Sequence, residues 1–137
     1  MNNPYDFFDE IVCINLKSRM DKRRHSEKVF SELNIPATFY NPNKSPYGGL
    51  YGCFQSHINV IRKAYHNGSN NVLIFEDDVI PSVFYSEDVI NKCIDFMKNN
   101  NWNLFYLGYT CSIKSILMPK KINELIYKSN VHCCHAY

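Results

Sequence analysis

The sequence predicts an α/β fold with three layers, in which helices cover both faces of a mostly parallel sheet. Two observations support this. Short apolar runs rich in β-branched residues alternate along the chain with longer segments of helical periodicity. The 137 residues are 45% hydrophobic, which is enough for one buried core and points to a single domain over residues 1–137.

The first strand is predicted over residues 10–16 (EIVCINL), because this run is almost continuously apolar. Asn15 and Leu16 close it. A capping-box pattern at residues 18–21 then predicts a helix that runs to about Leu33, with Val29, Phe30 and Leu33 facing the core.

The middle of the chain predicts a strand, a loop and a second helix. Residues 37–40 form the strand, and residues 41–50 are rich in Pro, Gly and Asn. The helix is expected over residues 51–66, followed by a glycine stop at Gly68. One helical face is predicted to be buried, and its members are Cys53, His57, Val60, Ile61 and Ala64.

The sequence of the C-terminal part of the chain predicts one more helix and several short strands. The helix is expected over residues 86–98, with a buried stripe formed by Val89, Ile90, Cys93, Ile94 and Met97. A strand is expected over residues 104–108, irregular chain over 110–121, and a pair of short strands over 125–128 and 131–137.

Three consecutive carboxylates, Glu76, Asp77 and Asp78, follow the apolar run at residues 72–75. A buried strand that ends in acids delivers them to the edge of the sheet, where ligands bind in open α/β folds. Adjacent carboxylates repel one another unless a cation lies between them, and Mn²⁺ and Mg²⁺ prefer oxygen ligands together with substrate phosphates. The block therefore indicates either a metal site for a phosphorylated ligand or a solvated acidic turn.

Basic residues crowd the first turns of the first predicted helix. A helix that starts after a buried strand is a good anion site, and an arginine there strengthens it. We expect Arg19, in the first turn, to bind such an anion, and Lys22, Arg24 and Lys28 to be solvated.

The composition of the chain limits which binding partners and which cellular compartment are expected. A net charge of +2 gives no electrostatic reason to expect nucleic-acid binding. No apolar run reaches the length of a transmembrane segment, and the N-terminus does not resemble a signal peptide, so a cytoplasmic protein is expected. In a reducing compartment, Cys13, Cys53 and Cys93 are most simply interpreted as small core residues. The run His132-Cys133-Cys134-His135 is rich in soft ligands but lacks zinc-finger spacing.

Five short blocks in order resemble glycosyltransferase family 25, which includes lipooligosaccharide and collagen galactosyltransferases. The first block is Ile14-Asn15-Leu16 with Arg19 and Asp21 after it. The others are Gly52-Cys53 with Ser56-His57, the acidic block at residues 73–79 (LIFEDDV), residues 102–108 (WNLFYLG), and residues 135–137 (HAY). The resemblance spans about residues 10–137.

The resemblance implies a GT-A-like nucleotide-sugar-binding fold and a metal-dependent, inverting transfer from a UDP-sugar, with galactose or glucose favoured. The acceptor would be a hydroxyl group of a saccharide or a protein. Mn²⁺, or Mg²⁺, would be held by Asp78 and Glu76. The donor would be bound by residues in and beside these blocks, with Glu76 shared with the metal; they are Asn15, Leu16, Arg19, Gln55, Ser56, His57, Glu76 and Asp77.

The chain also departs from the family pattern. Leu50 stands where the family often has an acid, Asn103 follows Trp102 where an aspartate is common, and the chain ends at the HAY block. After Asp95 the only carboxylate side chain is Glu124, so no general base for the acceptor can be assigned. The alternative is therefore a truncated, non-catalytic module that binds a nucleotide sugar or a protein partner. In either case, an exposed sheet edge would favour self-association.

Overall fold

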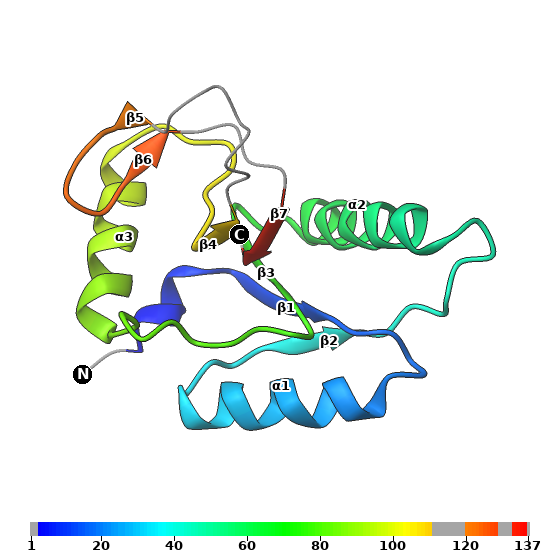
Figure 1. The fold of residues 1–137 in the computed structure, drawn as a ribbon. Coiled ribbons are helices and arrows are strands. Elements are labelled where there is room, and N and C mark those ends of the chain that lie inside the picture. Colours follow the sequence, from blue (N-terminus) through cyan, green and yellow to red (C-terminus); the bar gives the residue numbers. More distant parts are fainter. Residues whose placement is uncertain (1–2, 111–119, 129–132, 137) are drawn as a thin grey trace. The chain divides into compact units, whose positions relative to one another are not determined.

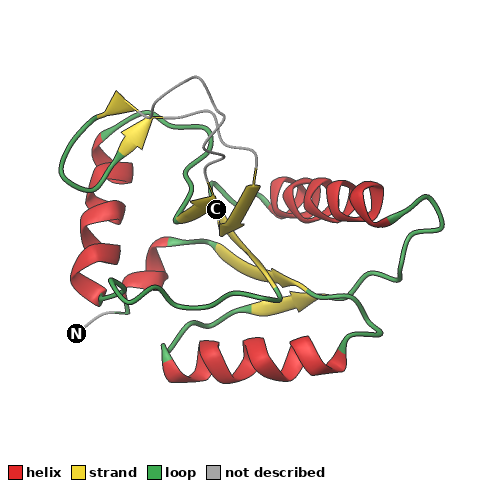
Figure 2. Cartoon of the chain, in the orientation of Figure 1, coloured by secondary structure: helices red, strands yellow, loops and turns green. Residues whose placement is uncertain are grey.

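The computed structural model of the chain describes residues 3–110, 120–128 and 133–136. The chain divides into two compact units, residues 1–81 and 82–137, and each unit is described by itself. Figure 1 labels the elements and Figure 2 shows the helices and strands of each unit. Within the described residues, no helix is both long enough and apolar enough to span a bilayer.

The first unit is built on a three-stranded parallel sheet in the order β2-β1-β3 (Figure 1). A short 3₁₀ helix, Pro4–Phe7, precedes the sheet. The strands are β1 (Glu10–Ile14), β2 (Thr38–Tyr40) and β3 (Val72–Glu76). Ile14 lies opposite both Tyr40 and Glu76, so the three strands end at one common edge. The predicted parallel pairing of these strands is confirmed.

Two helices, α1 (Met20–Glu32) and α2 (Gly49–Asn67), cover opposite faces of this sheet. On one face, the Phe30 ring of α1 lies against Phe39 of β2, with 6.0 Å between the ring centroids. On the other face, Asn59 of α2 donates a hydrogen bond to the Tyr40 hydroxyl at 3.1 Å. Neighbouring strand residues point to opposite faces, so Phe39 and Tyr40 distinguish the two layers. The strand order β2-β1-β3 with helices on opposite faces is the arrangement expected from the usual right-handed crossovers between parallel strands.

The core of the first unit lies between the helices and the central strands. Cys13, Leu73 and Ile74 are almost completely inaccessible to solvent. Phe75 extends the core toward α1, where its ring centroid lies 5.1 Å from that of Phe30. Burial of these apolar side chains is the main favourable contribution to folding of the unit.

The start of α1 differs from the prediction. Arg19, not Ser18, is the N-cap residue, and its side chain makes no capping hydrogen bond. The Arg19 carbonyl accepts a hydrogen bond from the Asn15 side chain instead, at 3.1 Å. The chain therefore enters the helix through a contact with the end of β1, and the capping box does not form.

The buried face of α2 also differs from the prediction. Ser56, Val60 and Ala64 are buried, whereas Cys53 and Ile61 are exposed. Ser56 can be buried because its hydroxyl donates to the Gly52 carbonyl at 2.7 Å within the same helix. The expectation that Cys53 is a core residue was wrong. Cys13 is buried as expected, and Cys93 is half-buried.

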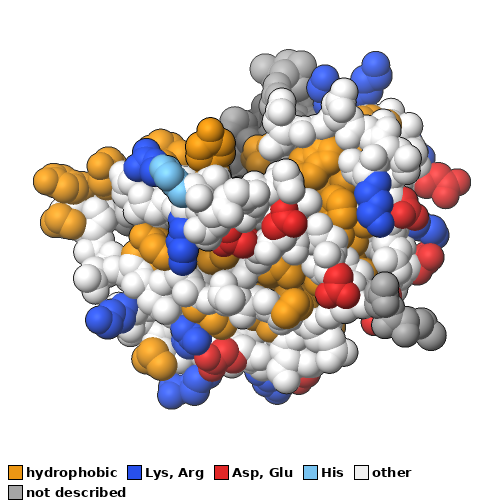
Figure 3. Space-filling model, turned by 180° about the vertical axis from the view of Figure 1, so that it is seen from behind, with side chains coloured by type: hydrophobic (Ala, Val, Ile, Leu, Met, Phe, Trp, Pro, Cys, Tyr) orange, Lys and Arg blue, Asp and Glu red, His pale blue; other side chains and the backbone are white. Residues whose placement is uncertain are grey.

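Large hydrophobic side chains remain exposed along α2 and the loop before it. Figure 3 shows hydrophobic surface at the edge of the molecule where this helix lies, at the left of that view. The exposed residues of this region are Tyr47, Leu50, Tyr51, Phe54, Ile61 and Tyr65.

The second unit contains α3 (Glu87–Asn99) and two antiparallel strand pairs. The helix is present as predicted, and Ser86 caps it by accepting a hydrogen bond from the Val89 amide at 3.2 Å. The buried stripe of α3 is narrower than predicted and consists of Ile90, Ile94 and Met97. The strand pairs are β4 (Gly108–Thr110) with β7 (Cys133–Ala136), and β5 (Lys120–Lys121) with β6 (Tyr127–Lys128).

Two strand predictions for this unit were wrong. The expected strand over residues 104–108 begins only at Gly108. Residues before it are held by α3, because the Trp102 indole donates to the Met97 carbonyl and the Phe105 ring lies 6.0 Å from that of Phe96. The two C-terminal strands do not pair with each other but with β5 and β4, respectively.

Candidate functional site

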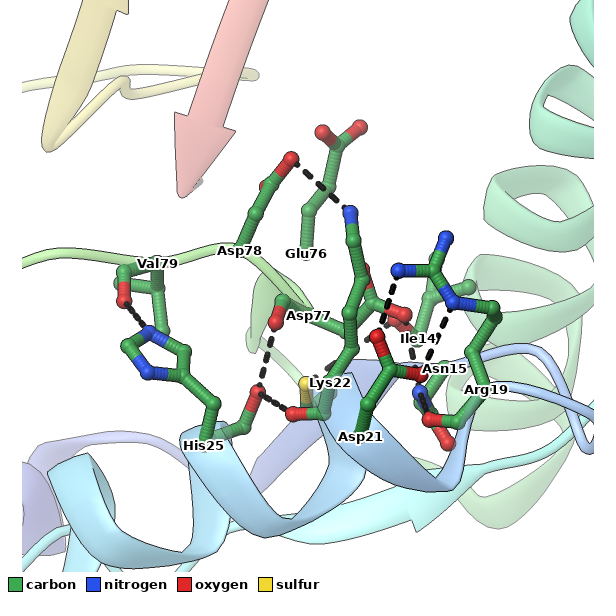
Figure 4. Close-up of polar contacts among 12 residues, drawn as sticks. Ile14, Asn15, Arg19, Asp21, Lys22, His25, Glu76, Asp77, Asp78 and Val79 are labelled. Carbon is green, nitrogen blue, oxygen red and sulfur yellow. Dashed lines mark hydrogen bonds and ion pairs between the residues drawn. The ribbon is translucent and has the colours of Figure 1, made fainter.

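The acidic block lies where β3 leaves the sheet. Glu76 is the last residue of β3, and Asp77 and Asp78 form the turn after it. Because side chains alternate along a strand, Phe75 and Asp77 face α1, whereas Glu76 faces α2. Asp77 therefore points away from the other two acids, whereas Glu76 and Asp78 extend to the same side in Figure 4.

Asp77 is held by Asn15 at the end of the neighbouring strand. The Asn15 amide nitrogen Nδ2 donates to Asp77 Oδ2 at 2.8 Å and also to the Arg19 carbonyl at 3.1 Å. Only 1% of Asn15 is exposed, although it is polar, and both hydrogen bonds compensate that burial. One buried amide thus joins the ends of β1 and β3 to the start of α1.

Lys22, on the first turn of α1, reaches two of the acids. Its Nζ lies 3.2 Å from Asp77 Oδ1 and 3.3 Å from Asp78 Oδ2 (Figure 4). Burial lowers the pKa of Lys22, but the hydrogen bonds with Asp77 and Asp78 raise it more, and the net shift is upward. An ammonium group therefore supplies positive charge between two carboxylates, and the expectation that Lys22 is simply solvated was wrong.

The backbone of the acidic turn is also fixed by α1. The Ser26 hydroxyl donates to the Asp77 carbonyl at 2.9 Å, and the His25 Nε2 lies 2.9 Å from the Val79 carbonyl. Ser26 is completely buried. These contacts set the direction in which the Asp77 and Asp78 side chains leave the turn.

On the other face, Glu76 meets α2. Its Oε1 lies 3.3 Å from His57 Nε2 and 3.9 Å from Cys53 Sγ. The His57 side chain is only 13% exposed. Burial and then the Glu76 carboxylate raise the pKa of the Cys53 thiol, so it stays protonated more readily than a free cysteine.

Arg19 lies at the same edge but is turned to its neighbour. Its guanidinium forms a two-point contact with Asp21, at 2.9 and 2.7 Å, and nearly half of its side chain is exposed. The pKa of Asp21 is lowered, and the hydrogen bonds from Arg19 are the largest cause of this shift. Asp21 thus holds the Arg19 guanidinium in one orientation at the start of α1. The exposed part of the guanidinium can still contact an anion.

The other predicted donor-binding residues are engaged mainly within their own elements. The Leu16 carbonyl accepts from the Arg19 amide at 2.8 Å. Gln55 donates to Asn59 at 3.0 Å, and the buried Ser56 hydroxyl is bonded to Gly52. Among the predicted residues, the structure therefore gathers Asn15 and Asp77 on the α1 face and His57 and Glu76 on the α2 face. Asp78, in the turn, meets Lys22.

Two residues of these clusters, Lys22 and Cys53, were missed by the sequence analysis. The sequence does contain a signal for each. Lys22 precedes the buried Ser26 by four residues, which places it on the same helical face. Cys53 precedes His57 by the same spacing, so both can reach one point beside the sheet.

Comparisons with known proteins agree with the family resemblance. The profile of glycosyltransferase family 25 (LPS biosynthesis protein) matches residues 47–130. Procollagen galactosyltransferase 1-B of Xenopus laevis is 26% identical over 129 residues, covering 74% of this chain and 21% of that protein. Procollagen galactosyltransferase 1 of Danio rerio gives the same values. The glycosyltransferase 25 family member of Drosophila melanogaster is 25% identical over 127 residues, covering 73% and 21%.

This chain spans about a fifth of the length of these curated relatives. No solved structure matches it significantly. The family profile covers α2, the acidic block and α3, whereas β1 and α1, which bring Asn15 and Lys22 to the site, precede the matched residues. On this match, over more than half of its residues, the chain belongs to glycosyltransferase family 25.

Proposed function

We propose that this protein transfers a sugar from a UDP-sugar, with galactose or glucose favoured, to a hydroxyl group of a saccharide or protein, with inversion. Family membership supports a nucleotide-sugar donor and a sugar acceptor. Relatives named procollagen galactosyltransferases support galactose as the first donor to test. The fold proposed for the complete domain is GT-A-like, and its β2-β1-β3 sheet is consistent with that architecture.

The observation that carries this proposal is the position of the acidic block. It lies at the carboxyl end of a parallel sheet, next to the start of α1, where α/β folds bind phosphorylated ligands. Asp77 and Asp78 already share the ammonium of Lys22. This pairing indicates that the turn needs a cation, and a divalent ion with a diphosphate would satisfy the same need.

The side chains present fit Mn²⁺ or Mg²⁺. Asp78 offers carboxylate oxygens that are about half exposed, and Glu76 offers a second carboxylate from the end of β3. Oxygen donors of this kind suit both ions. Lys22 would have to release Asp78, which its long and partly exposed side chain permits. When bound, the ion would neutralise the diphosphate as it leaves the sugar.

The other residues have separate proposed roles. Asn15 positions Asp77, and Asp77 in turn positions Lys22 and the turn that carries Asp78. Arg19 would bind the nucleotide phosphates through charge-assisted hydrogen bonds. Leu16, Gln55, Ser56 and His57 would shape the donor site at the ends of β1 and α2. No residue is assigned as the general base.

Calorimetry of UDP binding with and without Mn²⁺ tests the donor site. We expect binding that requires Mn²⁺ and is lost in Asp78→Ala. Asp88→Ala, which removes an exposed acid in α3, is the matched control and should bind normally. Equal affinity for UDP with and without the metal would contradict the proposed site.

Product analysis tests the reaction itself. The purified protein with Mn²⁺ would be screened for hydrolysis and transfer across UDP-sugars, with sugar and hydroxylysine acceptors. Release of UDP that depends on one sugar donor, together with a glycosylated acceptor, is expected. Metal-dependent UDP binding without hydrolysis or transfer would instead favour a donor-binding module.

A further inference from the structure

Three metal-ligating atoms meet on the α2 side of the acidic block. They are Cys53 Sγ, His57 Nε2 and Glu76 Oε1, and all lie within 4.8 Å of one another. The His57–Glu76 distance is 3.3 Å and the Cys53–Glu76 distance is 3.9 Å. This cluster is separate from the Lys22 contacts, which involve Asp77 and Asp78.

The separations are close to those of a tetrahedral zinc site. With zinc bonds of about 2.3 Å to sulfur and about 2.1 Å to nitrogen or oxygen, ligand atoms lie about 3.4–3.6 Å apart. The His57–Glu76 pair already has such a separation. Cys53 is exposed at its position on α2, so a small rotation of its side chain could shorten the distance to Glu76.

The elements that carry the ligands favour this arrangement. Cys53 and His57 are four residues apart on α2, so they project from one face of the helix. Glu76 comes from the end of β3, where strand alternation turns it toward α2. A helix and a strand of the same unit thus hold the three ligands.

We propose that Cys53, His57 and Glu76 bind one borderline-soft divalent cation, with Zn²⁺ preferred over Mn²⁺ and Mg²⁺. Thiolate and imidazole ligands favour zinc, whereas Mn²⁺ and Mg²⁺ prefer sites made of oxygen atoms. On binding, the Cys53 thiol loses its proton to the buffer and the sulfur becomes the ligand. Three protein ligands leave a fourth position for water or another small ligand.

This zinc site goes beyond the proposed donor chemistry, because it uses two residues of α2 and a different class of cation. It shares only Glu76 with the proposed manganese site. The Asp78→Ala variant therefore separates the two ideas, since it removes the preferred manganese ligand and leaves all three zinc ligands in place.

Cobalt substitution is the most direct test. Co²⁺ would be titrated into the full chain carrying Cys133→Ser and Cys134→Ser. These substitutions remove the two consecutive cysteines of the C-terminal run, which could also bind cobalt. We expect one equivalent to bind with a thiolate-to-cobalt charge-transfer absorption and the visible bands of a tetrahedral ion. Zn²⁺ should displace the cobalt and release it quantitatively, whereas Mg²⁺ should not.

Adding Cys53→Ser to this background should abolish the charge-transfer absorption and weaken Zn²⁺ binding at least tenfold. Replacing even a residue that only hydrogen-bonds to a metal ligand typically lowers metal affinity by about 10–100-fold. His57→Gln should weaken binding similarly but retain a cysteine–cobalt band. Cys93→Ser is the matched control and should change neither property. Thermal unfolding followed by circular dichroism would verify that each variant is folded.

Two results would overturn the proposal. One is an unchanged cobalt spectrum after Cys53→Ser in a folded protein. The other is equal affinity for Zn²⁺ and Mg²⁺ in the starting background. Cobalt binding that survives in Asp78→Ala supports the zinc site whether or not UDP binding is lost, so failure of one proposal does not imply failure of the other.

Discussion

The side-chain amide of Asn15 donates a hydrogen bond to Asp77 Oδ2 at 2.8 Å and so joins the carboxyl ends of β1 and β3. The same amide binds the Arg19 carbonyl. Both carboxylate oxygens of Asp77 therefore have a partner: Oδ2 accepts from Asn15, and Oδ1 pairs with Lys22. Asp78, by contrast, remains about half exposed, so the two adjacent acids have different capacities for a ligand.

Replacing Asn15 by alanine should destabilise the first unit. Asn15→Ala leaves Asp77 without its buried donor, and a hydrogen bond to a charged group is worth about 1.5–3 kcal/mol. Urea unfolding measures the change. Asn41→Ala, which removes an exposed asparagine contacting Arg23, should cost less than about 0.5 kcal/mol. Equal stabilities for the two variants would contradict the role given to Asn15.

Removing the charge of Lys22 should strengthen Mn²⁺ binding. The ammonium competes with a metal for Asp78, so Lys22→Met should raise the affinity by up to about fivefold, as expected for a partly exposed ion pair. Lys28→Met is the control, because Lys28 is exposed and pairs with Glu32, at 3.9 Å, away from the acidic turn. Calorimetry with Mn²⁺ and UDP measures both. A weaker affinity in Lys22→Met would indicate that the lysine binds the donor phosphates directly.

Arg19 and Arg24 should differ in their effect on UDP binding. Charge-assisted hydrogen bonds to phosphate are among the stronger polar contacts, so Arg19→Ala should weaken UDP binding by about ten- to a hundredfold. Arg24 is exposed further along α1, and Arg24→Ala should change the affinity little. If both substitutions had the same effect, bulk positive charge would explain the binding, and the assignment of Arg19 would be wrong.

Two glycines of α2 should respond oppositely to alanine. A Cβ at Gly52 would lie 2.9 Å from the Ser45 Cβ, so Gly52→Ala should cost about 1–3 kcal/mol through overpacking. Gly49 has nothing within 4 Å of such a Cβ, and Gly49→Ala should be neutral or stabilising by up to about 1 kcal/mol. Thermal unfolding compares them. Stabilisation by both alanines would mean that the loop before α2 does not pack on Gly52.

Stability should decline at alkaline pH because of Cys13. Burial raises the pKa of this thiol from 9.0 to about 12. Between these values the unfolded chain releases the proton while the folded protein keeps it, so deprotonation favours unfolding. Stability attributable to Cys13 is therefore intact below about pH 9 and falls as the pH rises toward 12.

The Cys13→Ala variant isolates this contribution. Its unfolding free energy, measured in urea between pH 8 and 11 (roughly the window set by the two pKa values), should fall less steeply with pH than that of the unchanged chain. Cys93→Ala removes a half-buried thiol elsewhere and should leave most of the slope. Parallel slopes for Cys13→Ala and the unchanged chain would show that this thiol already ionises in the folded state.

The sequence was sufficient for the features that depend on local pattern. The parallel strands β1 and β3, the helices and the terminal position of Glu76 all follow from periodicity and turn residues. It was insufficient where one tertiary contact decided between alternatives. Residues 104–107 have strand-forming side chains, but Phe105 packs against Phe96 of α3. Pattern alone cannot weigh such a contact against a strand.

The candidate site shows the same division. That acids follow β3 was readable from the sequence, but which partner each acid takes was not. Lys22 reaches Asp77 and Asp78 from 55 and 56 positions earlier in the chain, and such pairings depend on how α1 lies on the sheet. The rotation of α2 that exposes Cys53 was likewise invisible, because Ser56 satisfies its hydroxyl within the helix and takes the buried position.

The alternation of Glu76 and Asp77 across the sheet makes the length of β3 as important as its composition. Ile14 opposite Glu76 fixes the strand end relative to β1. Deleting or inserting a single residue within β3 would present an aspartate to Cys53 and His57, or would turn Glu76 toward Asn15, while leaving the local charge unchanged. Conservative replacements in this strand are therefore tolerable, whereas a shift of one position would exchange the chemistry of the two sides.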